Sequence, residues 1–104
     1  MLAIIARIQL APKDMDAYIA GAQKVLEPTR AEAGCQIYAI AIDVSEPNVV
    51  WISEQWESEE TLAAHLSSPH IAEFLELCNA VEITDVNVVK YDVASAGPME
   101  VPQA

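Results

Sequence analysis

The sequence predicts an α+β domain with the element order β-α-β-β-α-β. Three observations support this order. The hydrophobic pattern alternates between a period of two residues, typical of strands, and one of three to four residues, typical of helices. A short polar turn separates the second and third strands, and helix-capping residues precede the helical segments. At 104 residues, the chain has the length of one domain.

The first half of the chain contains a strand followed by a helix. Residues 2–10 alternate apolar side chains between two faces, which predicts a strand. Asp14 is a suitable N-cap, and from Met15 apolar residues recur at helical spacing. Pro28 is expected to bend or end this helix, with room for one more turn after it. Gly34 suits the left-handed position that follows many helices.

The second half contains a hairpin, a helical region and a last strand. Strands are predicted at residues 35–43, 49–57 and 83–93. The polar residues 45–48 predict a tight antiparallel turn between the first two of these strands. Ser58 is an N-cap candidate, and Ser68 followed by Pro69 begins a further helix. The resulting order is that of the ferredoxin-like fold, a four-stranded antiparallel sheet with helices on one face.

Both faces of the predicted sheet carry apolar side chains. Ile4 and Ile5 point to opposite faces of the first strand, and Trp51 and Ile52 to opposite faces of the third. Two helices cover only one face, and monomers rarely expose a large apolar patch. The sequence therefore predicts a homodimer in which a second copy covers the open face, with one tryptophan of the third strand at that interface.

Charge and composition limit the classes of partner. Five Lys and Arg residues against sixteen Asp and Glu give a net charge of −11, which argues against binding to nucleic acid or to an anionic membrane. No apolar run is long enough to span a membrane, and the N-terminus does not resemble a signal peptide. Cys35 and Cys78 are expected to be reduced, which predicts a cytoplasmic protein. The domain is expected to cover residues 1–93, followed by a tail at 94–104.

Glu54 and His65 are the candidates for acid–base chemistry. Glu54 shares a strand face with apolar residues, where a carboxylate is costly unless it is paired. It could be a tuned acid, an orienter for a base, or a carboxylate satisfied by an arginine or a backbone amide. His65 lies in the apolar stripe of a helix and could move protons near neutral pH. The competing interpretation is a buried neutral imidazole with a structural role.

Several other polar and aromatic residues each have two possible roles, one functional and one structural. Tyr38 could orient a ligand oxygen or reach solvent, and Trp56 could form an aromatic wall or pack in the core. Arg30 could hold an oxyanion or pair with an acidic side chain. His70 falls in the first turn of a helix, where a surface or capping role is favoured. No CxxC, paired-histidine or HExxH spacing and no glycine-rich phosphate loop is present, so no metal site is predicted.

Two groups of residues resemble motifs of antibiotic biosynthesis monooxygenase domains. The stretch EAGCQIY at residues 32–38 is similar to their E-x-G-C-x-x-Y segment. EQWES at 54–58, LAAHL at 62–66 and SPH at 68–70 are similar to their E-x-W-x-S…L-x-x-H-x-x-S-x-H segment. The resemblance covers about residues 1–93. It implies a dimeric α+β barrel with a pocket between sheet and helices in each protomer, and is strongest to the small quinol-monooxygenase-like members.

The resemblance also implies a chemistry. Known members oxidise quinols or polycyclic phenols with O₂ and use no flavin, haem or metal, so the expected cofactor is none. The expected partners are a small aromatic substrate, O₂ and a second copy of the chain. His65 matches the helix histidine of the family and is the expected base, with Glu54 orienting it. Tyr38, Trp56 and Arg30 are expected to line the pocket or contact an oxyanion.

Two other functions remain open from the sequence, because a fold does not fix a reaction. One is a non-catalytic or stress-associated ligand-binding barrel, which predicts that side chains fill the pocket. The other is an isomerase for a phosphorylated sugar of the autoinducer-2 type, which requires a free basic group at the pocket mouth. Haem degradation, found in other relatives, is disfavoured because those relatives carry a tryptophan where this chain has His65.

Overall fold

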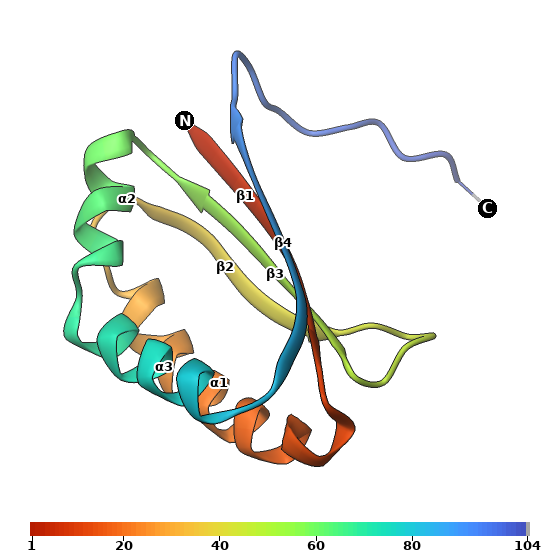
Figure 1. Ribbon diagram of the computed structural model, residues 1–104. Coiled ribbons are helices and arrows are strands. Elements are labelled where there is room, and N and C mark those ends of the chain that lie inside the picture. The colour runs from red at the N-terminus through yellow and green to blue at the C-terminus, as the bar shows by residue number, and fades with distance from the viewer. Residues whose placement is uncertain (104) are drawn as a thin grey trace.

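Four antiparallel strands form one sheet in the order β2-β3-β1-β4, and the helices lie on one of its faces (Figure 1). The computed structural model describes residues 1–103. Its elements are β1 (Leu2–Leu10), the short 3₁₀ helix η1 (Pro12–Asp14), α1 (Met15–Arg30), β2 (Cys35–Ile42), β3 (Val49–Trp56), α2 (Glu59–Leu66), α3 (Pro69–Ala80) and β4 (Ile83–Asp92). The predicted ferredoxin-like order is confirmed, with the second helical region divided into α2 and α3.

Helix α1 continues through Pro28 to Arg30. Pro28 has no N–H to donate to the carbonyl of Lys24, but it stands only two residues before the end of the helix, so little of the helix follows the missing bond. Gly34 then adopts a φ of 82°, in the left-handed region that favours glycine. The N–H of Glu57 donates to its carbonyl at 2.8 Å, which ties the loop after α1 to the end of β3.

The two faces of the sheet differ sharply in burial. On β1, the even-numbered residues are buried beneath the helices, whereas Ile5 on the opposite face is 42% exposed. Ile5 is aligned with Val89 of β4, which is also exposed on the helix-free face. As predicted, the two tryptophans of β3 point to opposite faces. Trp56 is fully buried beneath the helices, and Trp51 is half-buried and donates its Nε1–H to Asp43 at 2.8 Å.

The helices cover β2, β3 and β1 but leave β4 open. Val86 and Val88 are aligned with Ile8 and Ala6, so their side chains point to the helix-bearing face. Both valines are nonetheless more than half exposed, while their β1 partners are buried. A hollow therefore lies between α2 and the β4 side of the sheet, and its floor is formed by β1 and β3.

Residues 94–103 are exposed, have no helix or strand, and extend away from the domain (Figure 1). The last residue of the expected tail, at position 104, lies outside the described residues. Across residues 1–103, no helix combines the length and the apolar character required to cross a lipid bilayer.

Candidate functional site

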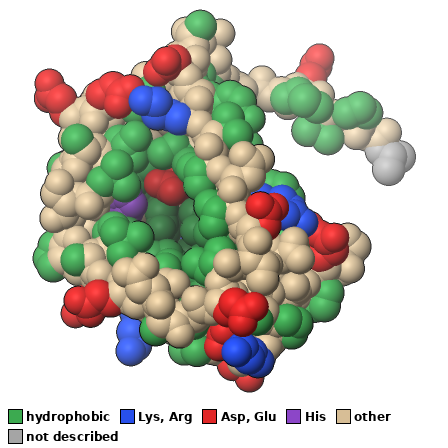
Figure 2. Space-filling model, in the orientation of Figure 1, with side chains coloured by type: hydrophobic (Ala, Val, Ile, Leu, Met, Phe, Trp, Pro, Cys, Tyr) green, Lys and Arg blue, Asp and Glu red, His purple; other side chains and the backbone are tan. Residues whose placement is uncertain are grey.

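The hollow beside β4 is a largely apolar cleft of about 390 Å³. Figure 2 shows it as a green-walled depression with a carboxylate inside it. The residues that line it are Ile4, Glu54, Glu59, Leu62, Ala63, Leu66, Val88 and Lys90. Lys90 and Glu59 form an ion pair of 2.9 Å at exposed positions on β4 and α2, so the cation of the cleft is already paired. Glu54 is the other ionisable group of the lining.

Glu54 is held in a buried position by one hydrogen bond. The Nε1–H of Trp56, two residues along the same strand face, donates to its Oε1 at 2.9 Å. The carboxylate side chain is 13% exposed, and this burial raises its pKa above the ordinary value of 4.5. The hydrogen bond from Trp56 and the proximity of His65 oppose the rise but do not cancel it. Glu54 therefore combines a place in the lining of the cleft with a pKa that burial raises.

His65 lies directly behind Glu54. Ser58 and Thr61 form a capping box that begins α2, and this start places Leu62 and His65 on the buried face of the helix. The Nε2 of His65 is 3.8 Å from Oε1 of Glu54. Its ring packs against Trp56, with the ring centroids 4.5 Å apart, and it is 2% exposed. A polar ring this deeply buried is expected to have at least one hydrogen-bond partner.

Glu32 is the partner of His65 on its other side. The Oε2 of Glu32 is 2.7 Å from Nδ1 of His65 and 2.9 Å from Nε2 of His70. Ser68 completes the cluster, because its Oγ lies 3.2 Å from the same nitrogen of His70 and donates to the carbonyl of His65 at 2.7 Å. The loop after α1, the end of α2 and the start of α3 thus meet at one carboxylate oxygen.

The donor atoms of Glu32, His65 and His70 lie within 4.8 Å of one another, the one such grouping found within residues 1–103. This proximity alone is compatible with a metal ion. Both nitrogens, however, are at hydrogen-bond distance from the same carboxylate oxygen. We therefore describe the three residues as a hydrogen-bonded cluster, in which each of these two nitrogens can donate to the carboxylate.

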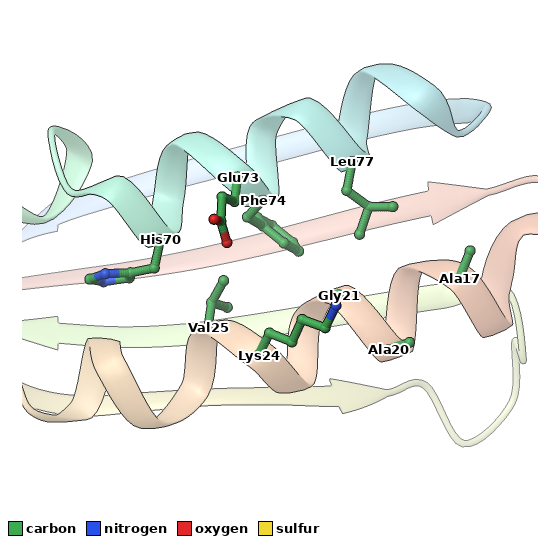
Figure 3. Close-up of a pocket in the computed structure, with 9 residues that line it drawn as sticks. All are labelled: Ala17, Ala20, Gly21, Lys24, Val25, His70, Glu73, Phe74 and Leu77. Atoms are coloured by element: carbon green, nitrogen blue, oxygen red, sulfur yellow. The ribbon is translucent and has the colours of Figure 1, made fainter.

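His70 also borders a second, smaller cavity. This groove of about 230 Å³ lies between α1 and α3, with His70 at one end (Figure 3). The side chain of Leu77 lies directly over Gly21, where a Cβ would collide with its end. Lys24 and Glu73 supply the charged side chains of its lining. The Glu32 cluster therefore lies between the Glu54 cleft and this groove.

The five residues expected at the site occupy different layers. Glu54 lines the cleft, and His65 and Trp56 pack immediately behind it. Tyr38 is buried deeper, with its ring edge-on to His65 at 5.5 Å between centroids, and burial raises its pKa. Arg30 is exposed and donates its Nε–H to the carbonyl of Tyr38 at 2.9 Å.

Arg7 and Arg30 differ in their partners. Arg7 pairs with Glu46 at 2.8 Å and with Asp85 at 3.5 Å. For Arg30 no carboxylate lies within 4.0 Å in the part of the chain that the structure describes. Its guanidinium is engaged instead by the backbone of β2, beyond the lining of the cleft.

The sequence alone did not assign a role to Glu32 and favoured a surface or capping role for His70. His70 is in fact only 19% exposed at its side chain and bonded to Glu32. The two histidines lie 33 and 38 residues from Glu32, so no local spacing signals the cluster. The available signal was the presence of all three residues in the two motifs that carried the family resemblance.

Comparison with known proteins places the chain in a family. The family model described as antibiotic biosynthesis monooxygenase matches residues 1–77. An uncharacterized protein of Synechocystis is 31% identical over 75 residues, which are 72% of this chain but 51% of that protein, so the chain spans about half of its length. YgiN of Escherichia coli, named as a probable quinol monooxygenase, is 29% identical over 98 residues, covering 85% of this chain and 93% of YgiN.

The fold is matched by solved structures. A crystal structure of a Deinococcus radiodurans protein, described as an antibiotic biosynthesis monooxygenase, superposes with a TM-score of 0.88 at 20% identity. The match covers 97% of this chain and 100% of that one. At 20% identity, this structural similarity establishes that the two chains share a fold.

Proposed function

Since this chain belongs to the antibiotic biosynthesis monooxygenase family, we propose that it is a cofactor-independent monooxygenase that oxidises a small quinol or polycyclic phenol with O₂. The observation that carries the proposal is the apolar cleft of about 390 Å³ with the carboxyl of Glu54 inside it and His65 behind. Ligand pockets span roughly 300–1,000 Å³ and combine apolar walls with a few polar groups. A ring system with one hydroxyl directed at Glu54 fits this description.

The proposed reaction needs only proton removal and O₂. For a simple hydroquinone it is written C₆H₆O₂ + O₂ → C₆H₄O₃ + H₂O, in which one oxygen atom enters the ring and the other leaves as water. The deprotonated quinol is electron-rich enough to transfer an electron to O₂, and the resulting radicals combine at a ring carbon. The protein has to bind the flat substrate, accept its hydroxyl proton and exclude bulk water.

Glu54 and His65 divide the proton-handling role in this proposal. Glu54 faces the cleft and contacts the substrate hydroxyl, and His65 receives the proton at Nε2 from 3.8 Å away. Trp56 supports both groups, through its hydrogen bond to Glu54 and its ring packing on His65. Tyr38 backs the imidazole, and Arg30 holds the strand backbone at Tyr38.

The two alternative functions are less well supported by the cleft. The non-catalytic or stress-associated ligand-binding barrel was expected to have this region filled by side chains, whereas the cleft is about 390 Å³. A sugar-phosphate isomerase would need a free cation at the mouth to hold the phosphate. Lys90, the cation in the lining of the cleft, is paired with Glu59 at 2.9 Å.

We also propose that the active form is a homodimer. The helix-free face of the sheet carries exposed apolar residues on three strands, among them Ile5, Ile37 and Tyr91. The family resemblance implies that this face of the sheet packs against a second copy of the chain. In a single protomer the helices leave the face uncovered.

The test is O₂ uptake by metal-stripped protein with a panel of hydroquinones and anthrones. We expect uptake by the native chain and a loss of about 10²-fold or more in the His65→Ala variant, because removal of a general base typically costs this much. Glu60→Ala, at an exposed position of the same helix, is the matched control and should keep full activity. Unchanged turnover in His65→Ala would remove His65 from the mechanism.

A further inference from the structure

The cluster behind the cleft contains one carboxylate oxygen shared by two imidazoles. We infer that Glu32 and His70 are positioning residues that fix His65 as the Nδ1–H tautomer, with its lone pair on Nε2 directed toward Glu54. The inference rests on the proposed function, in which Nε2 of His65 accepts the substrate proton. It adds two residues to the site, neither of which lines the cleft.

The tautomer follows from the chemistry of the partners. An ionised carboxylate has only acceptors, so a nitrogen 2.7 Å from its oxygen must carry the hydrogen. A neutral imidazole has one N–H and one lone pair. When Nδ1 of His65 donates to Glu32, the lone pair is therefore on Nε2, the nitrogen that faces Glu54 at 3.8 Å. This is the nitrogen that can accept a proton from the cleft.

His70 and Ser68 keep the shared oxygen in place. His70 donates from Nε2 to the same oxygen at 2.9 Å, which restricts rotation of the Glu32 carboxylate. Ser68 lies 3.2 Å from that nitrogen of His70 and is bonded to the backbone of His65. Glu32 and His70 are 17% and 19% exposed at their side chains, so the cluster is largely shielded from water that would compete for these bonds.

The charge of Glu32 has a second consequence. When His65 receives a proton on Nε2, the ring becomes an imidazolium with Nδ1–H still directed at the carboxylate. The negative charge is then at hydrogen-bond distance from the new positive charge, and it stabilises the charged ring. Glu32 therefore orients the imidazole of His65 and stabilises the imidazolium that forms when the ring accepts a proton. The aspartate of a serine hydrolase triad does the same for its histidine.

NMR of the imidazole nitrogens in the full, metal-stripped chain tests the inference directly. The chain has two histidines, so the His70→Ala variant assigns the signals of His65 without ambiguity. At mildly alkaline pH, we expect a protonated Nδ1 and an unprotonated Nε2 for His65 in the native chain. Glu32→Gln retains an acceptor oxygen and should keep this tautomer, whereas Glu32→Ala should lose it.

Kinetics separate positioning from a merely structural role. We expect both Glu32 variants to lower kcat by about 10-fold or more with little change in KM, because Glu32 lies outside the cleft, and Glu32→Ala to lose more than Glu32→Gln. Glu27→Gln and Glu27→Ala, at an exposed position of α1, are the matched controls. A His65 that carries its hydrogen on Nε2 in the native chain, or keeps Nδ1–H in Glu32→Ala, would overturn the inference. So would metal-type nitrogen shifts in the protein as purified.

The NMR readout needs no substrate. It therefore supports or overturns the tautomer assignment even if no compound of the panel is oxidised. Conversely, O₂ uptake that depends on His65 combined with an Nε2–H tautomer would support the proposed function and contradict this inference.

Discussion

At the scale of single residues, the site depends on one buried carboxyl and the groups that support it. Glu54 stays largely out of water and accepts one hydrogen bond, from Trp56 at 2.9 Å. Burial raises its pKa, so in the folded protein it retains a proton at pH values where an exposed glutamate is ionised. The same burial that raises the pKa of Glu54 costs stability once the side chain is charged.

This cost predicts a pH dependence of the free energy of unfolding. As pH rises above the ordinary value of 4.5, the unfolded chain releases the Glu54 proton before the folded chain does. The folded state then binds more protons, so stability falls with pH through this range. Glu54→Gln should remove that decrease and lower turnover by about 10²-fold or more.

Urea unfolding midpoints measured across this pH range provide the check. Glu76→Gln, at an exposed position of α3, is the control and should follow the native pH profile. Parallel profiles for the native chain and Glu54→Gln would show that Glu54 is not destabilised by its burial.

At the scale of elements, α2 is the helix that positions His65, the proposed base, and its start depends on the loop after α1. The hydroxyl of Ser58 accepts from the N–H of Thr61 at 3.2 Å, and the N–H of Ser58 donates to the hydroxyl of Thr61 at 3.1 Å. Thr61 packs directly against Gly34. The same loop carries Glu32, so one close contact sets the relative position of Glu32 and His65.

Gly34→Ala is therefore expected to destabilise the fold by about 1–3 kcal/mol, a typical cost for backbone strain at a single residue. Its φ of 82° disfavours a side chain, and a Cβ would collide with Thr61. Gly97→Ala is the matched control, because a Cβ there would meet no atom within 4 Å. Equal urea midpoints for the two variants would show that the loop can shift to accept the side chain.

The elements were largely predictable from the sequence, while the site was only partly so. The alternation in β1 and the capping residues Ser58 and Ser68 are local signals, and they correctly predicted strand and helix starts. Glu54 stood out because a carboxylate on an apolar strand face is costly. The Glu32 cluster depends on three segments meeting in space, and no spacing along the chain encodes that meeting. At Pro28 a local signal was overridden, because α1 continues to Arg30 although proline disfavours helix.

At the scale of the whole molecule, the sheet has one face covered by helices and one face open (Figure 1). Ile5 lies near the middle of β1, aligned with Ser53 of β3 and Val89 of β4. Ile5 and Val89 are both exposed on the helix-free face. A second copy placed on this face would bury them, which is the basis of the proposed homodimer.

Ile5→Asp should convert the dimer to a monomer, because each copy would place a charge in the apolar centre of the interface. Size-exclusion chromatography with light scattering measures the change as a halved mass. Leu75→Asp introduces the same charge at an exposed position of α3 and should keep the dimer mass. A native chain that is already monomeric at the concentrations used for catalysis would contradict the proposal.

We propose that this cleft supports oxygen insertion with the side chains of the chain alone, and following the oxygen atoms tests this proposal most directly. Metal-stripped protein is supplied with isotopically labelled dioxygen and the hydroquinone that gives the fastest O₂ uptake. The mass of the product is then determined by mass spectrometry. We expect one labelled atom per product molecule with the native chain and a rate near background with His65→Ala. An unlabelled quinone as the product, with the label recovered only in peroxide or water, would contradict it.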